Sequence, residues 1–303
     1  MTRSVSPLAL LCLAWLLSHR LQCQDLDPRS YIRVPVNGTF ITIGGAYSAG
    51  NVVTDPTLPL QDLSASIVTT SVGIARSFDF LGHTSQILAV LPYSWVTATA
   101  TIAGEDSSVT RSGLADARFR WSVLLIGAPS RAVDNFATVR RQTVVGASIM
   151  VVAPIGQFFP EKLINIGTNR WSFKPELALS QPIADRWLLD VYAACWFFTD
   201  NATFFPGTAM REQDPLAAVQ SHISYTFSPG LWAAFNLTYY VGGASYINGE
   251  QRDDHQSNAR IGGTVVFPLT AENSIRVAAS TGAIVRIGAR FTTVSVGWQA
   301  AFF

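Results

Sequence analysis

Residues 170–180 read RWSFKPELALS, and neighbouring letters differ in polarity along the whole stretch. One set of alternate positions carries Arg170, Lys174 and Glu176, and the intervening positions carry Trp, Phe, Pro and Leu. Successive side chains of a β-strand point to opposite faces, so this pattern predicts a strand with one apolar face and one charged face. A sheet built from such strands needs an apolar environment on one side and water or ion pairs on the other.

The same alternation recurs through most of the chain and defines about twelve predicted strands. Many of them exceed the roughly 9 to 11 residues that a tilted strand needs to cross a bilayer, and the roughly 5 to 6 typical of soluble sheets. The predicted strands lie near 36–47, 63–78, 84–98, 113–127, 143–154, 169–181, 185–199, 215–228, 231–246, 257–268, 272–282 and 289–303.

Short polar connections alternate with long ones, as in outer-membrane barrels, where short periplasmic turns alternate with long external loops. The short connections are 78–83, 181–185, 228–230 and 268–273, and the long ones are 48–62, 99–112, 155–168, 200–214 and 247–256. The connection 127–142 should be a periplasmic turn but is long, so we expect it to contain either a short helix or an additional strand. Pro92 predicts a bulge or kink in its strand.

An open sheet of such strands would leave two unpaired edges, which are a liability in water and impossible in lipid. We therefore predict an all-β fold, a transmembrane antiparallel up-and-down β-barrel over 36–303; the alternative is a large exported soluble β domain. No segment after residue 23 approaches 18 uninterrupted apolar residues, which excludes a transmembrane helix. In the last strand, Phe303 falls on the polar row, so either it faces inward or a bulge shifts the register.

The N-terminus has the features of an export signal, with Arg3 before an apolar stretch too short to span a bilayer. We predict a signal peptide over 1–23, with a lipidated Cys23 as the alternative, then an N-terminal periplasmic segment over 24–35. Loss of Arg3 and Arg20 leaves 19 basic and 20 acidic residues, a balance that argues against nucleic acid as a partner. The expected location is the cell outer membrane, and the expected partners are its lipid and the assembly machinery that reads a terminal aromatic residue.

Cysteine and histidine usage gives no sign of a metal or cofactor site. Cys195 is the one cysteine after the predicted signal peptide, so no internal disulfide can form. His83, His222 and His255 lie far apart in the sequence, without the close spacing of a metal site. We expect neither a metal nor a cofactor.

Charged residues on the polar rows are the candidates for lining the barrel interior, where they can reach water or one another. Basic members outnumber acidic members, and either they form salt-bridged plugs or they line a conducting or ligand-binding lumen. The candidates are Asp116, Arg118, Arg120, Arg170, Lys174, Glu176, Arg186, Asp190, His222, Arg260 and Arg276.

Three short motifs stand at predicted strand ends: Gly113-Leu114-Ala115-Asp116, Ala153-Pro154-Ile155-Gly156 and Gly167-Thr168-Asn169-Arg170-Trp171. With them, the chain from about residue 36 to its end resembles the outer-membrane transporter-like family named for the meta-pathway of phenol degradation. Ala115 and Ile155 depart from the family pattern, which prefers Gly and Thr there. The resemblance implies an outer-membrane barrel and uptake of hydrophobic or aromatic compounds. Asp116 near Arg118 and Arg170 would form either a fold-stabilising ion pair or a substrate contact.

The leading functional hypothesis is a passive channel for small molecules, whose fixed lumen charges tune selectivity. A twelve-stranded lumen is narrower than that of porins with roughly 16 to 18 strands, and the loop 155–168 could fold inward, cap the mouth or remain external. An enzyme is the second class, but surface lipid hydrolysis needs a supported Ser-His pair, and His222 with Ser224 would face the interior. We therefore expect no enzyme. A structural or surface-interaction barrel is the third class.

Overall fold

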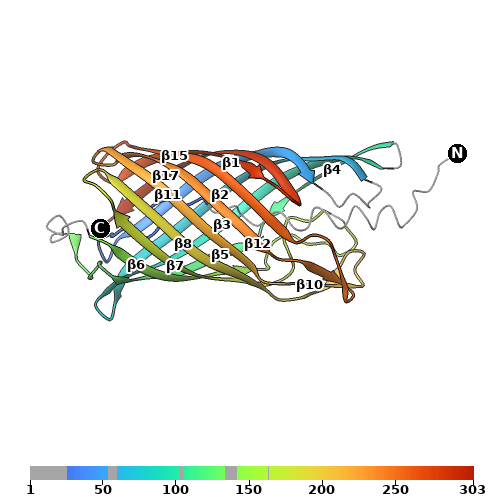
Figure 1. The fold of residues 1–303 in the computed structure, drawn as a ribbon, viewed down its shortest axis with the longest axis horizontal. Helices are drawn as coiled ribbons and strands as arrows, with labels where there is room; N and C mark the ends of the chain where they lie inside the picture. The colour runs from blue at the N-terminus through green and yellow to red at the C-terminus, as the bar shows by residue number, and fades with distance from the viewer. Residues whose placement is uncertain (1–25, 54–59, 103–104, 134–141, 163) are drawn as a thin grey trace.

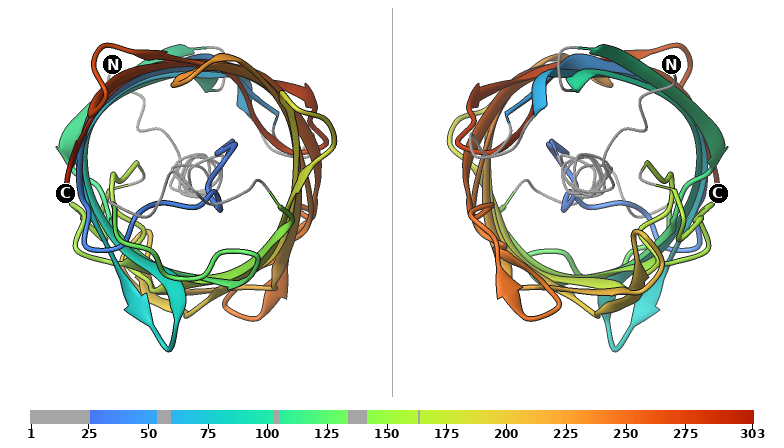
Figure 2. Two further views of the ribbon diagram at one scale, coloured as in Figure 1. Left: turned by 90° about the vertical axis from the view of Figure 1, so that its left-hand side faces the viewer. Right: turned by 90° about the vertical axis from the view of Figure 1, so that its right-hand side faces the viewer.

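The computed structural model describes residues 26–53, 60–102, 105–133, 142–162 and 164–303. These residues form a closed antiparallel 12-strand β-barrel, which Figure 1 shows from the side and Figure 2 along its axis. No helix in the described ranges is long and apolar enough to cross a membrane. The predicted fold class is therefore confirmed. The predicted signal peptide over 1–23 lies outside the described residues.

Closure of the barrel depends on the first strand. β1 (Thr39–Val53) pairs with β2 (Leu60–Phe80) on one side and with the last strand, β17 (Gly288–Phe302), on the other. From β3, neighbouring strands around the barrel follow chain order. These are β3 (His83–Ile102), β4 (Glu105–Leu114) with β5 (Ala117–Ile126), β6 (Val144–Ala153), β7 (Ser172–Pro182), β8 (Trp187–Phe198), β11 (Leu216–Ser228), β12 (Leu231–Gly242), β15 (Gln256–Pro268) and β16 (Asn273–Ile284).

β4 and β5 are two parts of one barrel strand with a break between them. β3 pairs with β5 from Ser85 to Val90 and with β4 from Tyr93 to Ile102. The Ala115 amide donates to the Pro92 carbonyl at 2.9 Å at this break, which is where we predicted a bulge or kink. The expectation that 99–112 is a loop is wrong, because its threonine and valine residues extend the ladder into a long hairpin.

Two other predicted loops also contain strands. β9 (Asn201–Phe204) and β10 (Ala209–Gln213) lie within 200–214, and β14 (Glu250–Gln251) lies within 247–256. They form a separate four-stranded sheet with β13 (Ser245–Ile247), which begins in the predicted strand 231–246 and ends at the start of the second loop. The apolar centre of the sheet consists of Phe204, Ala209 and Ile247. This sheet stands at the end of the barrel that carries the long connections, at the right of Figure 1.

The two faces of the barrel wall have opposite chemistry. In β7, Lys174 and Glu176 point inward and are buried, whereas Leu177 and its apolar row point outward and Leu177 is 63 % exposed. Outward-facing leucine, valine, isoleucine and aromatic side chains recur on every side of the barrel. Such a surface is stable only against hydrocarbon, so the barrel spans a membrane with its polar residues enclosed.

The C-terminal strand runs to its end without a bulge. β17 pairs with both β1 and β16 without any register shift, so Phe303 keeps the inward parity of Gln299. Its ring packs edge-on against Phe40, with 5.9 Å between ring centroids. Of the two alternatives for the terminal residue, the inward position is therefore the observed one.

The long connection after β5 is only partly described. After β5 the chain contacts the turn between β2 and β3, where Pro129 makes an isolated bridge to His83 and the Ser130 amide donates to the Gly82 carbonyl. Residues 134–141 lie outside the described ranges, so the helix or strand expected within 127–142 stays a prediction there.

An outward charge should destabilise the membrane-inserted barrel according to its depth. Leu177→Arg lies in the middle of β7 and should cost roughly 2–4 kcal/mol of folding free energy. Phe227→Arg, beside the short turn after β11, is the matched control and should cost about 0–1 kcal/mol. Urea titration of folding into lipid vesicles measures both, and equal costs would contradict the inside-out arrangement.

Candidate functional site

The residues before β1 enter the barrel instead of lying beside it. We expected 24–35 to be a periplasmic segment, but its described part, 26–35, lies within the lumen, where Figure 2 shows it reaching from the wall toward the centre. We call residues 26–35 the N-terminal segment. At the rim, the Val36 and Asn37 amides donate to the carbonyls of Arg131 and Ser77. The segment is inside because the polar inner wall supplies partners for its polar groups.

Arg29 attaches the N-terminal segment to the wall formed by β8, β11 and β12. Its amide donates to Asp190 Oδ2 at 3.1 Å, and its guanidinium donates to Ser224 and Thr226 at 2.9 and 2.7 Å. The guanidinium also lies 4.5 Å from the centre of the Trp232 ring. Charge-assisted hydrogen bonds of this kind fix position and orientation.

Tyr31 is a second attachment point and is fully buried. Its hydroxyl donates to Glu176 Oε1 at 2.8 Å and lies 2.7 Å from Ser148 Oγ. Glu176 also forms an ion pair with Lys174 at 3.3 Å and lies 3.7 Å from Nη2 of Arg120, whose guanidinium stacks on the Tyr31 ring at 4.6 Å. Tyr31, Lys174 and Arg120 therefore share one buried carboxylate, which offsets the cost of enclosing it.

Other inward-facing polar residues form hydrogen bonds to one another along the inner wall of the barrel. His222 Nδ1 lies 2.9 Å from Asn236 Oδ1, and the Asn236 amide nitrogen donates to Thr264 at 2.9 Å. Arg260 donates to Ser280 Oγ and to the Phe291 carbonyl. These contacts are hydrogen bonds, whereas the ion pairs around Glu176 are of the kind expected for salt-bridged plugs.

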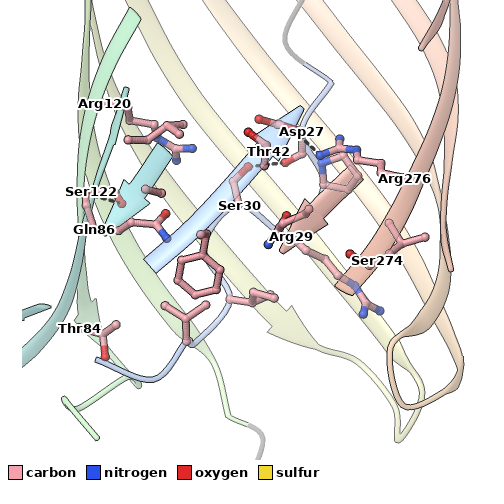
Figure 3. Close-up of a pocket in the computed structure, with 18 of the residues that line it drawn as sticks. Asp27, Arg29, Ser30, Thr42, Thr84, Gln86, Arg120, Ser122, Ser274 and Arg276 are labelled. Carbon is pink, nitrogen blue, oxygen red and sulfur yellow. Dashed lines mark hydrogen bonds and ion pairs between the residues drawn. The ribbon is translucent and has the colours of Figure 1, made fainter. Parts of the chain in front are cut away.

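Two cavities lie beside the N-terminal segment. The larger, about 430 Å³, has an apolar wall that includes Phe40, Leu88 and Leu124, together with Arg29, Arg120 and Arg276; Figure 3 shows its polar members. We call it the amphipathic pocket. The second, about 370 Å³, is lined mainly by polar side chains with Arg118, and we call it the polar pocket. Asp27 and Arg276, paired at 2.8 Å, line both pockets.

The loop 155–168 folds into the mouth of the barrel, which was one of the three expected arrangements. Ile164 and Ile166 are buried against an inward-facing apolar cluster. Asn165 holds the loop in a tight turn, because its side chain bonds the backbone of Phe159 and Lys162. The cluster consists of Val52, Leu63, Ala65, Ile67, Val96, Ala98, Ala100, Ala289 and Phe291.

Asp116 latches this loop to the break between β4 and β5. Its Oδ1 accepts the Gly156 amide at 2.9 Å, and its Oδ2 accepts the Thr168 amide and hydroxyl at 2.8 and 2.6 Å. A Cβ on Gly156 would lie 2.7 Å from Asp116 Oδ1 and 2.8 Å from the Gly167 Cα, so only glycine fits there. These backbone bonds give Asp116 a fold-stabilising role, although through amides instead of the ion pair that we considered.

The third motif builds the rim next to the latch. Asn169 adopts a left-handed backbone conformation and donates to Asn201 and Thr203. Arg170 donates to Gln213 and stacks on Phe198, and Arg211 donates to the same Gln213 oxygen. Burial lowers the pKa of Arg211 to about 10, and burial together with the nearby Arg211 charge holds the pKa of Arg170 well below its usual value.

The other motif positions support this rim. Gly113 lies against the Gln157 side chain, Trp171 is exposed on the outer face, and its amide donates to Thr199. Pro154 lies at the start of the loop directly after β6. The motif residues are thus brought together around one loop at the barrel mouth.

The candidate residues fall into four groups. Arg118, Arg120 and Arg276 line the two pockets. Asp116 and Arg170 belong to the latch and rim, and Arg186 lies exposed in the turn before β8, outside the lumen. The rest are buried on the inner face: Lys174, Glu176, Asp190, His222 and Arg260.

Asp27, Arg29 and Tyr31 are site residues that the sequence analysis missed. They lie in no strand, so no alternation marks them. The available signal was the charged composition of DLDPRSYIR at 25–33, a segment too short for a domain and directly before the first strand. Within the described ranges, no three His, Cys, Asp or Glu side chains are grouped so that they could hold a metal ion.

Comparison with known proteins supports the fold. The family model described as "Putative MetA-pathway of phenol degradation" matches residues 14–298. The crystal structure of the COG4313 outer membrane channel from Pseudomonas putida F1 is similar, with a TM-score of 0.75 and 20% identity over 92% of this chain and 100% of that chain. The transport unit of the autotransporter AIDA-I from Escherichia coli has a TM-score of 0.58 and 9% identity, covering 97% of each chain. No curated protein matches by sequence.

Replacing Asp116 with asparagine should loosen the mouth loop. The amide group would turn an NH₂ toward either Gly156 or Thr168, so one backbone amide would lose its acceptor, at a cost of about 1–3 kcal/mol. This loss is measured as the urea concentration at which half of the protein no longer runs as the folded, heat-modifiable band on a gel. Glu161→Gln, an exposed change in the same loop, is the control, and equal midpoints for the two variants would contradict the latch.

Tyr31→Phe should release the N-terminal segment more often. The change removes the hydroxyl that bonds Glu176 and Ser148, and one such bond is worth about 1.4 kcal/mol, or about tenfold in the released fraction. Trypsin cleavage after Arg29 and Arg33, followed by mass spectrometry, should be about tenfold faster. Tyr47→Phe, on the outer face, should leave the cleavage rate unchanged. A rate in Tyr31→Phe equal to that of the unmodified chain would show that this contact does not hold the segment.

Proposed function

This chain belongs to the MetA-pathway phenol-degradation family, and we propose that it is an outer-membrane channel for passive diffusion of small hydrophobic or aromatic molecules. Movement would follow the concentration gradient, because the barrel itself supplies a path and no energy source. We also propose that the barrel transports its solute and does not catalyse a reaction.

The amphipathic pocket is the observation that carries the proposal. It lies inside the barrel and combines apolar side chains such as Phe40, Leu88 and Leu124 with a few polar groups. Ligand sites for organic molecules have this composition, with an apolar wall that accommodates the body and a few polar groups that orient it. Its volume of about 430 Å³ is suited to small molecules.

Two features restrict the path to small solutes. The N-terminal segment occupies part of the lumen next to the pocket, where Tyr31 and Arg29 hold it to the wall. At the mouth, Ile164 and Ile166 fill the space beside β1, β2, β3 and β17. A solute must therefore pass beside these two obstacles, which supports selection by size and by apolar character.

A non-conducting structural or surface-interaction barrel is the second candidate. The four-stranded sheet outside the barrel and the shared ion network around Glu176 favour it, since both would suit a filled barrel that presents its loops. Conductance separates the two candidates, because a structural barrel has no need of a continuous path.

The test is conductance in planar bilayers, followed by liposome swelling with methyl and phenyl glucosides, two sugars that differ by one aromatic ring. We expect conductance and a preference for the phenyl sugar. Leu88→Asn, which puts a polar group on the apolar wall, should lower that preference about fivefold, as expected from the loss of about 1 kcal/mol of apolar contact.

Leu81→Asn is the matched control, because Leu81 is exposed in the turn after β2 and lies outside the pocket. Its left-handed backbone suits asparagine, so folding should be unaffected. A barrel that neither conducts ions in bilayers nor allows liposomes to swell would refute the channel and favour the structural barrel. Conductance with equal rates for the two sugars would refute the preference for aromatic solutes.

A further inference from the structure

We propose that the lumen binds small organic anions, and that Arg276 exchanges its ion pair with Asp27 for the acidic group of the solute. The inference rests on the proposed channel function, because it names the solute class that the amphipathic pocket admits. A single ring or short apolar chain with one carboxylate or sulfonate is the chemistry that fits.

The charge around both pockets is positive. The amphipathic pocket has Arg29, Arg120 and Arg276 against Asp27 as its charged lining residues. The polar pocket adds Arg118 and shares Asp27 and Arg276. A cavity with low-dielectric walls and one sign of charge concentrates ions of the opposite sign. Anions should therefore enter this part of the lumen more readily than cations.

Arg120 lines the amphipathic pocket, and it shares its carboxylate partner with other side chains. Its Nη2 is buried without a hydrogen bond, and the nearest carboxylate oxygen, Oε1 of Glu176, lies 3.7 Å away. Glu176 already accepts from Tyr31 and pairs with Lys174. Because Glu176 is shared between Lys174 and Arg120, this carboxylate offsets their positive charge only in part, which favours an anion in the pocket.

The pair between Arg276 and Asp27 is the exchangeable contact. Arg276 projects from β16, and both of its partners, the Asp27 carboxylate at 2.8 Å and the Leu26 carbonyl at 3.1 Å, belong to the N-terminal segment. The segment belongs to no strand ladder, so this pair can open while the barrel remains intact. The two side chains are 37% and 57% exposed, and an ion pair in contact with water stabilises little, so a solute carboxylate can compete with Asp27.

The pair also stands where the two pockets meet. Figure 3 shows Asp27 and Arg276 pointing toward each other across the top of the amphipathic pocket. A solute whose acidic group has displaced Asp27 keeps its apolar body against Leu88, Leu124 and Trp232. It then leaves for the polar pocket by way of Arg118. Weak successive sites of this kind allow an ion to enter and to leave again.

The experiment measures reversal potentials in planar bilayers with two isosteric organic ions, benzenesulfonate and phenyltrimethylammonium. In the unmodified protein, the anion should be the more permeant. Removing one of the three pocket arginines with Arg276→Gln should lower the anion-to-cation permeability ratio about fivefold, and Asp27→Asn should raise it by a similar factor. Arg286→Gln, which removes an arginine from an exposed ion pair with Asp253, is the matched control and should leave the ratio unchanged.

Calorimetric titration of the detergent-solubilised barrel with benzenesulfonate is the second measurement, and heat-modifiability on gels verifies that each variant is folded. Binding should weaken about fivefold in Arg276→Gln and not in Arg286→Gln. Two outcomes would overturn this inference without refuting the channel. In one, the barrel conducts potassium chloride but is more permeable to the organic cation; in the other, the anion-to-cation permeability ratio is the same in Arg276→Gln and Asp27→Asn as in the unmodified protein. A barrel that is silent but binds benzenesulfonate through Arg276 would refute the channel and retain the binding site.

Discussion

The fold depends on the requirement that backbone polar groups in hydrocarbon be satisfied within the protein. A sheet meets this requirement only when its first and last strands pair, as β1 and β17 do along their full lengths. Closure then separates the side chains into two environments. Apolar residues such as Leu177 meet lipid, and Lys174 and Glu176 are enclosed together. The interior must therefore supply its own partners for charge, and the ion network around Glu176 follows from that need.

The enclosed charges are organised by two segments that are not part of the barrel strands. From one end, the N-terminal segment brings Arg29 to Asp190 and Tyr31 to Glu176. From the other, the loop latched by Asp116 brings Ile164 to the apolar cluster at the mouth. The space left between these segments and the wall is where the two pockets lie. The shape and the charge of the space inside the barrel thus depend on these two insertions as well as on the strands.

The barrel itself could be predicted from sequence because alternation in strands such as β7 is a local property of neighbouring residues. The same reasoning predicted the inner face for Arg118, Arg120 and Arg276, which line the two pockets. It assigned Arg186 to the lumen because the alternation of inward and outward positions was extended beyond the start of β8 into the preceding turn. It could not place the N-terminal segment, since the partners of Arg29 lie 161 to 197 residues further along the chain. Nothing in a short charged stretch identifies distant strands as its binding surface.

The long sequence separation of these contacts has a consequence for the order of assembly. Leu26 accepts a hydrogen bond from Arg276, which lies 250 residues later in the chain. The surface that receives the N-terminal segment therefore exists only once β16 is in place. The N-terminal segment, although it precedes every barrel strand in the chain, would be among the last parts to settle, and the barrel would pass through a form with a wider lumen before this segment narrows it.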